Sequence, residues 1–210
     1  NLSKERILSE LLKILKLENF LNIIDNKELL EIFRLIFPEF KNINRFKNFK
    51  FLKNHIENSV TFLLAILLVD LQGNHEYFSH KYKVSNKIRE NLSLIGNKFK
   101  DLKSSKDFFN KRLKENLYYV GVENLKILYC IGLLDKKKIV EKDIAFLKNI
   151  KKITVPKFPF DGKFLIKKGI QEGKKIGIIL KEAEQVWLQN NFNLSSKEFE
   201  VVIKKNTISN

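Results

Sequence analysis

The sequence predicts an all-α fold, a multi-helix array without a sheet. Apolar residues recur at the three- and four-residue spacing of a buried helical face through most of the chain. Only 3 prolines and 8 glycines interrupt the 210 residues, which leaves room for long helices. Helix-start signals precede the apolar runs: the N-cap candidates Ser3, Asn26 and Ser85, and a capping box at Ser195 and Glu198.

The first two expected helices are amphipathic. The helix that follows Ser3 should bury a stripe of five residues, Ile7, Leu8, Leu11, Leu12 and Leu15. The helix that follows Asn26 should end at Pro38, because proline cannot continue a helix. Its buried face is expected to carry Leu29, Phe33, Ile36 and Phe37.

The middle of the chain should hold the core. The longest apolar run, Val60 to Val69, is too short to cross a bilayer and is expected to form the central helix. Residues 118–134 are apolar enough for another buried helix, in which Cys130 should be buried and reduced. Charges of both signs alternate between residues 98 and 115, which is typical of an exposed helical face.

A proline- and glycine-punctuated stretch near the end of the chain predicts a helical hairpin. Pro156 and Pro159 favour an extended arm, residues 162–168 a short helix, and Gly169 a left-handed residue that ends it. Gly173 should open a long helix, and Gly177 one turn later should allow the close approach of another backbone. The long helix should bury Ile176, Leu180, Ala183 and Trp187.

This hairpin is a candidate phosphate site. The start of its second helix places amide donors and a positive helix dipole at Gly173, beside Lys174 and Lys175. The preceding short helix adds Lys163, Lys167 and Lys168. The alternative is a tight corner whose lysines are merely solvated.

The charge of the chain favours a polyanionic partner. With 40 Lys and Arg against 24 Asp and Glu, the formal net charge is +16 and the pI is about 9.7. Nucleic acid is the first expectation and an anionic membrane surface the second, although a lysine-rich composition can also reflect coding bias. The sequence shows no signal peptide, so we expect a cytoplasmic protein that does not bind membranes.

A second basic segment, residues 41–53, has no acidic residue and is interleaved with aromatics. Its basic residues can bind RNA phosphates, and Phe46, Phe49 or Phe51 could stack on bases. The alternative is that these phenylalanines belong to the core, which leaves phosphate contact as the expected role of the segment. The expected RNA-contacting residues are Lys41, Arg45, Lys47, Lys50 and Lys53.

We expect no metal site in these residues. Asp70, His75 and His80 suggest a metal-dependent phosphohydrolase, but that chemistry needs an adjacent His-Asp pair, and the sequence has none. The two histidines are therefore interpreted as isolated surface residues.

The stretch from Pro156 to Phe192 resembles the carboxy-terminal end of bacterial CCA-adding enzymes and related poly(A) polymerases, the class II tRNA nucleotidyltransferases. That family carries Phe-Pro-x-x-Gly-(Lys/Arg)-Asp-Leu, followed by Gly-Ile-x-x-Gly-x-x-Ile-Gly and a helix that ends in Trp. Phe164 stands where the family has Asp, which puts the capping or RNA-contacting role of that Asp in question here. The matching residues are Phe158, Pro159, Gly162, Lys163, Leu165, Gly169, Ile170, Gly173, Ile176, Gly177, Leu180, Glu184 and Trp187.

Three weaker patches follow the family in the same order: Leu2–Leu15, Leu35–Phe40 and Val84–Glu90. In the first patch, Glu5, Arg6 and Glu10 resemble the neck motif that braces the nucleotide-recognition helix. The alternative is a solvated face with an Arg6–Glu10 ion pair. The third patch resembles a Leu-Ser-Asn-x-x-Arg helix start, and we count its Arg89 among the RNA-binding residues.

The resemblance implies three regions: neck and start of the helical body (1–55), helical body (56–153) and tail (154–210). It implies an enzyme that adds CCA to tRNA 3′ ends from CTP and ATP with Mg²⁺, with the tRNA acceptor and elbow backbone held by the body and tail. The family's catalytic Asp-x-Asp, in a separate head, is absent from this sequence; Glu141 and Asp143 are spaced alike but lie in a lysine-rich helical segment.

We therefore expect the chain to carry no catalytic residue, to bind no cofactor, and to be inactive without the head. The alternatives are a stand-alone basic helical RNA-binding module, the equivalent part of a poly(A) polymerase, and a peripheral membrane or scaffold protein.

Overall fold

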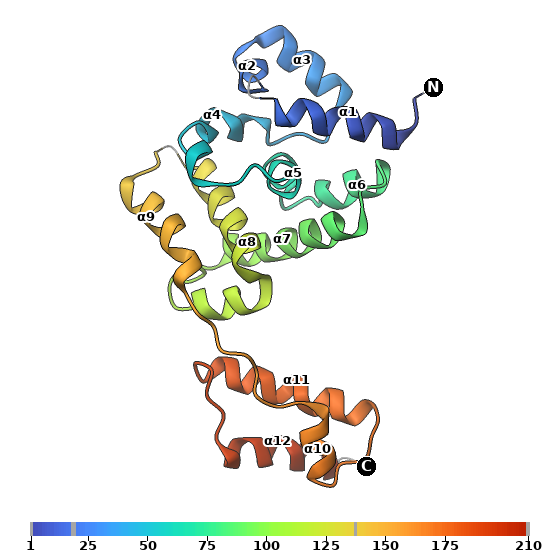
Figure 1. The fold of residues 1–210 in the computed structure, drawn as a ribbon, viewed down its shortest axis with the longest axis vertical. Helices are drawn as coiled ribbons and strands as arrows, with labels where there is room; N and C mark the ends of the chain where they lie inside the picture. Colours follow the sequence, from blue (N-terminus) through green and yellow to red (C-terminus); the bar gives the residue numbers. More distant parts are fainter. Residues whose placement is uncertain (1, 18–19, 137, 209–210) are drawn as a thin grey trace. The chain divides into compact units, whose positions relative to one another are not determined.

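The computed structural model describes residues 2–17, 20–136 and 138–208 of the chain. These residues form twelve α-helices and three short 3-10 helices and contain no strand, so the predicted all-α fold is confirmed (Figure 1). The chain divides into two compact units, Asn1–Ile153 and Thr154–Asn210. The division falls where the sequence places the start of the tail, whereas residues 1–55 and 56–153 belong to one unit.

The N-terminal unit is built around α5 (Val60–Leu68), which packs against α6, α7 and α8. Every residue from Phe62 to Leu68 is buried, as expected of a helix that is apolar on all sides. The prediction of a central core helix is therefore confirmed. The other elements of this unit are α1 (Lys4–Lys16), α2 (Phe20–Asp25), α3 (Lys27–Ile36), η1 (Ile43–Arg45), α4 (Phe46–Phe49), η2 (Lys53–His55), α6 (Asn74–Lys81), α7 (Asn86–Ser104), α8 (Leu113–Leu134), α9 (Glu141–Asn149) and η3 (Ile150–Lys152).

The long helix α8 is the one helix of the described residues that is long and apolar enough, by length and composition, to cross a membrane. It lies against α5 and α7, and half of its most apolar window is buried. Gly121, with φ 75° and ψ 167°, breaks its helical geometry near the start. Cys130 is fully buried in it, as predicted.

The predicted caps of the first helices are confirmed, but the buried face of α3 differs from the prediction. Ser3 and Asn26 accept hydrogen bonds from the backbone N–H groups of Arg6 and Leu29. In α3 the buried residues are Leu30 and Phe33, whereas Leu29 and Ile36 are 45% and 54% exposed.

The register of α3 is set by aromatic packing. Phe33 meets Phe20 edge-on at 5.7 Å between ring centroids and lies near Phe37 and Phe40 at 5.2 and 5.6 Å. Leu30 is one turn before Phe33 and is buried with it, which rotates Leu29 and Ile36 towards solvent.

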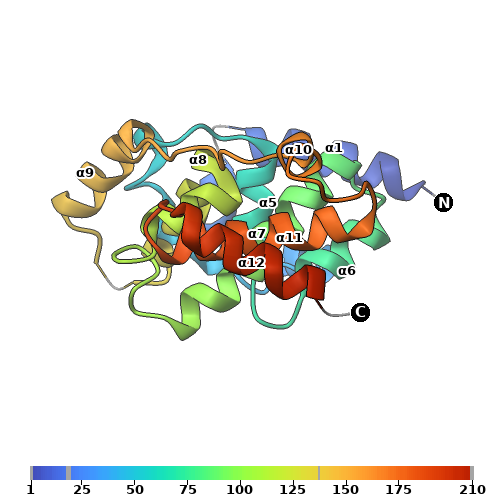
Figure 2. The same ribbon diagram turned by 90° about the horizontal axis from the view of Figure 1, so that it is seen from below.

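The C-terminal unit consists of an extended arm, α10 (Gly162–Lys167), α11 (Lys174–Gln189) and α12 (Ser196–Ile208). Helices α11 and α12 lie side by side in both views (Figures 1 and 2). The core of the unit contains Leu165, Ile179, Ala183, Phe199 and Val202, with Ile170, Ile176 and Leu180 partly buried against it.

The turns of this unit follow the predicted signals. Gly169 is left-handed at φ 86° and ends α10, and Gly173 at φ 150° precedes α11. The backbone N–H of Ser195 donates to Glu198 at 2.8 Å and that of Glu198 to the Ser195 hydroxyl at 3.3 Å, which confirms the capping box. The prediction for Gly177 is wrong: a Cβ added there meets no atom within 4 Å, because this side of α11 faces solvent.

Candidate nucleic-acid interface

The lysines predicted at the tail hairpin lie in α10 or directly after it, and in the first turn of α11. Lys163, Lys167, Lys168 and Lys174 are exposed and Lys175 is half-buried. No side chain caps this end of α11, which begins after Gly173. Helix N-termini attract anions through their N–H groups and the helix dipole, and Lys174 and Lys175 add positive charge in the first turn of this one. The hairpin therefore has the chemistry of a phosphate-binding surface.

The residue at which the sequence departs from the family pattern has a structural role. Phe164 packs against Phe160 and Phe199, with ring centroids 5.0 and 5.7 Å apart. Asp161 caps α10 instead, by accepting the backbone N–H of Phe164 at 2.9 Å. A capping carboxylate is thus present at the start of this helix, three residues earlier than the family's Asp.

The basic segment 41–53 presents lysines but buries most of its aromatics. Lys41, Lys47, Lys50 and Lys53 are all exposed. Phe46 and Phe49 are 2% and 4% exposed and pack edge-on to each other, which confirms that they belong to the core. Phe51 is 57% exposed, with the Lys50 ammonium 5.5 Å from its ring centroid.

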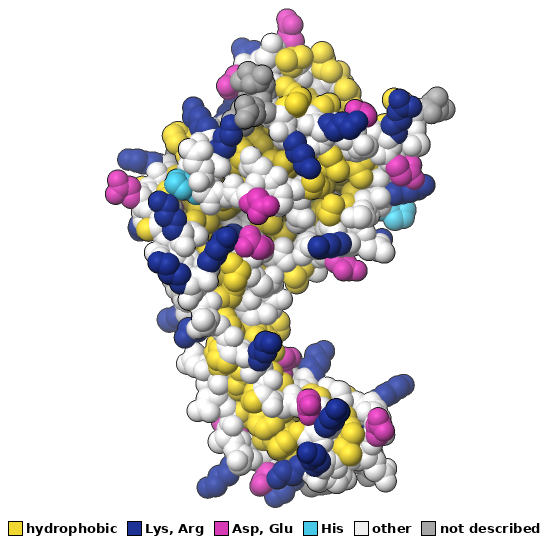
Figure 3. Space-filling view, viewed as in Figure 1, with side chains coloured by type: hydrophobic (Ala, Val, Ile, Leu, Met, Phe, Trp, Pro, Cys, Tyr) yellow, Lys and Arg dark blue, Asp and Glu magenta, His cyan; other side chains and the backbone are white. Residues whose placement is uncertain are grey.

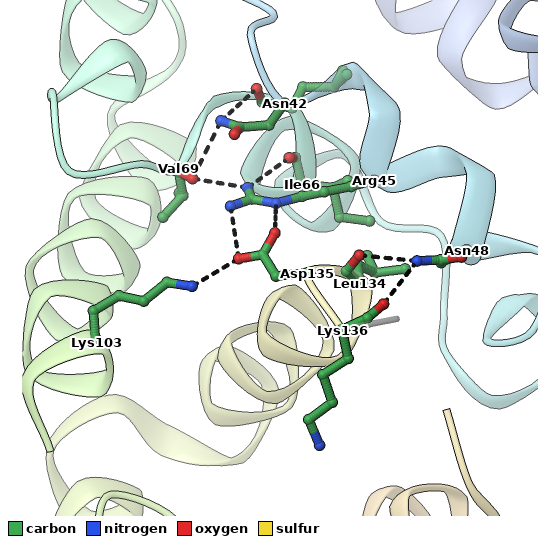
Figure 4. A network of polar contacts seen from close by, with 10 residues as sticks. Asn42, Arg45, Asn48, Ile66, Val69, Lys103, Leu134, Asp135 and Lys136 are labelled. Atoms are coloured by element: carbon green, nitrogen blue, oxygen red, sulfur yellow. Dashed lines mark hydrogen bonds and ion pairs between the residues drawn. The ribbon is translucent and has the colours of Figure 1, made fainter. Parts of the chain in front are cut away.

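Arg45 does not lie on the basic surface, so its predicted role in RNA contact is wrong. Its side chain is 6% exposed and donates to the carbonyl oxygens of Ile66 and Val69 at 2.9 and 2.8 Å (Figure 4). It also donates to both carboxylate oxygens of Asp135, from Nε at 2.8 Å and Nη2 at 3.3 Å. These bonds stabilise the end of α5 and join it to the end of α8.

The neck residues form ion pairs other than the predicted one. Glu10 pairs with Lys13 at 2.9 Å rather than with Arg6, and Glu5 pairs with Lys83 at 2.7 Å. The hydrogen bond from Lys83 lowers the pKa of Glu5. Glu5, Arg6 and Glu10 are all exposed, so their role in bracing a nucleotide site stays a prediction.

Arg89 lies on the exposed side of α7. Its guanidinium donates to Asn86 Oδ1 at 3.1 Å, one turn earlier in the same helix. Ser85 occupies the N-cap position as predicted, but its side chain makes no capping bond. Arg89, His75 and His80 line a cavity of about 440 Å³ between α6 and α7.

His75 is a core residue, which corrects its interpretation as a surface histidine. It is 2% exposed, and among the described residues no protein group hydrogen-bonds either ring nitrogen, although Glu76 Oε1 lies 3.8 Å from Nε2. Asp70 accepts the backbone N–H groups of Gln72 and Asn74 at 3.0 and 3.3 Å, so its carboxylate organises the turn before α6. Among the described residues, no three His, Cys, Asp or Glu side chains are grouped closely enough to hold a metal ion.

The stability of the N-terminal unit should fall as the pH falls below about 6.5, the pKa of a solvated histidine. Burial lowers the pKa of His75, an effect that Glu76 and Asp70 oppose and Lys100 reinforces. Because the folded state binds this proton less readily than the unfolded state, stability is complete above 6.5 and is lost below it. In urea melts, the free energy of unfolding should fall less between pH 7.5 and pH 5.0 in His75→Gln than in wild type. His80→Gln, at an exposed position, should retain the wild-type dependence.

A further group of cations was missed in the sequence. Lys126 of α8, with Lys148 and Lys151, lines a cavity of about 270 Å³ that His55 and Ser59 also border. The Lys126 side chain is only 12% exposed, and both this burial and the neighbouring Lys151 lower its pKa. Its ion pair with Glu123 is long, at 3.5 Å. The sequence could have indicated this group, because Lys126 is a lysine within the apolar run 118–134.

Asp143 participates in local structure. It is 3% exposed and accepts the hydroxyl of Tyr129 at 3.0 Å, the backbone N–H of Val140 at 3.1 Å and the Lys136 ammonium at 3.3 Å. Glu141 is exposed on the first turn of α9. Asp143 thus fixes the start of α9, and its oxygens already have partners.

No protein-family model matches the chain, and neither does any curated protein.

Proposed function

We propose that this chain is the RNA-binding neck, body and tail of a template-independent RNA nucleotidyltransferase that extends tRNA 3′ ends. Exposed lysines of each unit bind backbone phosphates of the tRNA acceptor and elbow. The sequence has no Asp-x-Asp motif, so we assign nucleotide addition from CTP and ATP with Mg²⁺ to a head that carries the catalytic carboxylates.

The observation that carries this proposal is the tail hairpin. Asp161 caps α10, Gly169 ends it, Gly173 precedes α11, and Lys174 in the first turn of α11 is exposed, as are Lys163, Lys167 and Lys168 of the preceding segment. Gly169, Gly173 and Lys163 match the family pattern in its most specific stretch, whereas Asp161 stands at one of the variable positions of that pattern. The local structure agrees with a motif whose glycines form a phosphate-binding turn.

The lysines suit a backbone-reading role. A lysine ammonium binds phosphate as a point charge without reading sequence, whereas base-specific contacts need fixed donors and acceptors. Most of these side chains are exposed, and among the described residues Lys163, Lys167, Lys174 and Lys175 have no ion pair within the protein. Binding should therefore depend steeply on salt and little on sequence.

Replacing Lys174 and Lys175 by alanine should weaken tRNA binding and flatten its salt dependence. Each lost phosphate contact should lower the slope of log Kd against log salt concentration by about 0.7–0.9. The free energy of unfolding should change by less than about 0.5 kcal/mol, because substitutions of this kind on the surface are nearly neutral. Filter binding across a salt series, with a urea melt of each variant, measures both quantities.

The matched control is Lys181→Ala with Lys197→Ala, two exposed lysines of the same unit away from the turn. It removes the same charge, so a general electrostatic effect would lower the slope equally in both variants. A specific site at the start of α11 requires a larger loss in the Lys174 and Lys175 variant. If affinity and slope are unchanged in that variant, the hairpin is a structural turn that does not contact tRNA.

A further inference from the structure

The C-terminal unit contains an open aromatic cleft of about 210 Å³. Phe160 of the arm, Phe164 of α10, and Phe199 and Ile203 of α12 form its apolar lining. At about 30 Å³ per water molecule, the cleft has room for a flat ring but not for a folded element. Its rim carries Lys168, Ser196, Glu200 and Lys204.

The aromatic rings of this cleft are arranged for stacking. Phe199 is nearly parallel to Phe160, with centroids 4.4 Å apart at 28°, and to Phe164 at 5.7 Å and 27°. Phe199 is buried, while Phe160 and Phe164 are only half-buried and line the opening. Phe160 and Phe164 are tilted by 54° to each other, so the three rings are not one parallel stack. A planar aromatic group that stacks on Phe164 would extend the nearly parallel pair of Phe164 and Phe199.

The charges at the rim favour an anionic chain bearing such a group. Lys168 and Lys204 are exposed, and the Lys168 ammonium lies 5.9 Å from the Phe164 ring centroid. Glu200 is the single acid on the rim. The unit as a whole has ten lysines against six acidic residues. Figure 3 shows hydrophobic side chains gathered on one face of this unit, with basic and acidic side chains around them.

We propose that this cleft binds one unpaired nucleobase of the bound RNA, stacked beside Phe164, with a neighbouring phosphate on Lys168 or Lys204. Aromatic stacking with lysine contacts to the backbone is the usual way in which single-stranded nucleic acid is held without sequence preference. The inference rests on the proposed RNA-binding function and adds a contact to bases. Its aromatic platform lies in the tail, not in the basic segment 41–53, where Phe46 and Phe49 are buried. An apolar peptide is the alternative ligand, but it offers no anionic group for the two lysines to bind.

The test compares two polyanions of equal phosphate number, oligo(A) and the same chain with every base removed. Wild-type protein should bind oligo(A) at least about fivefold more tightly, because stacking of one base changes affinity by about five- to a hundredfold. Phe164→Leu keeps an apolar side chain and removes the ring, so it should abolish this preference. A 2-aminopurine in the oligonucleotide should lose fluorescence on wild type but not on Phe164→Leu.

The matched control is Tyr77→Leu, at an exposed aromatic residue of α6 in the N-terminal unit. It should leave the preference for oligo(A) intact. Equal binding of the two polyanions by wild type, or a preference that survives Phe164→Leu, would overturn the cleft as a base site while tRNA binding through lysines stands. Failure of tRNA itself to bind would instead overturn the proposed function. Binding of an uncharged apolar peptide that Phe164→Leu abolishes and oligo(A) does not compete would assign the cleft to peptides.

Discussion

Replacing Arg45 by alanine should lower the free energy of unfolding by about 3–5 kcal/mol, the usual loss when one partner of a buried ion pair is removed. The variant would leave the carbonyl oxygens of Ile66 and Val69 without the guanidinium donor. It would also leave the Asp135 carboxylate, 28% exposed, with Lys103 as its remaining cationic partner at 2.9 Å. Urea denaturation followed by circular dichroism measures the loss.

Two further substitutions separate charge from geometry at Arg45. Arg45→Lys keeps the charge but cannot bond two carbonyls and a carboxylate at once, so it should lose most of the stability that alanine loses. Arg45→Met fills the volume and should lose less than alanine if packing dominates. An alanine variant as stable as wild type would contradict the structural role assigned here.

The same network predicts a contribution from Asp135 in acid. Burial raises the pKa of this carboxyl, but the bonds from Arg45 and Lys103 more than offset burial, and the pKa lies below its ordinary value. The ionised pair therefore adds stability above the unfolded pKa of about 3.9, and this stability is lost as the pH falls through the lower folded value. In Arg45→Ala, the fall in unfolding free energy that comes from protonation of Asp135 should be smaller than in wild type.

Arg45 also shows where sequence reasoning stops. Its neighbours Lys41, Lys47 and Lys50 are equally basic and lie in the same short segment, and all three are exposed. What distinguishes Arg45 is Asp135, ninety residues away, and two carbonyls at the end of α5. No local pattern encodes such partners.

Signals that act within a few residues were read correctly from the sequence. The caps at Ser3 and Asn26, the turn at Gly169 and the box at Ser195 and Glu198 each depend on bonds within one helical turn. The all-α class follows from the same local rules. In α3, by contrast, more than one face carries apolar residues. Packing against aromatic rings of other elements determines which face is buried.

The burial of His75 likewise depends on a residue distant in the sequence, Gly96, whose lack of a side chain leaves room for the imidazole. A Cβ built on Gly96 of α7 would lie 2.1 Å from His75 Nε2 and 2.3 Å from Cε1. The imidazole therefore occupies the space that any larger residue at position 96 would need. Glycine in the interior of a helix normally costs stability, and here it allows the histidine of α6 to pack against α7.

Gly96→Ala should consequently destabilise the protein by about 1–3 kcal/mol, the usual cost of overpacking, even though alanine favours a helix more than glycine does. Gly132 of α8 is the matched control: its added Cβ would come no closer than 3.8 Å to Leu102, so Gly132→Ala should be neutral or stabilising by up to about 1 kcal/mol. Urea melts measure both glycine variants. Melts of His75→Ala and of the double variant His75→Ala with Gly96→Ala then complete a double-mutant cycle. Because His75→Ala vacates the contested space, Gly96→Ala should cost little in that background. An equal cost with and without the imidazole would mean that the close approach of α6 to α7, rather than the ring, excludes the methyl group.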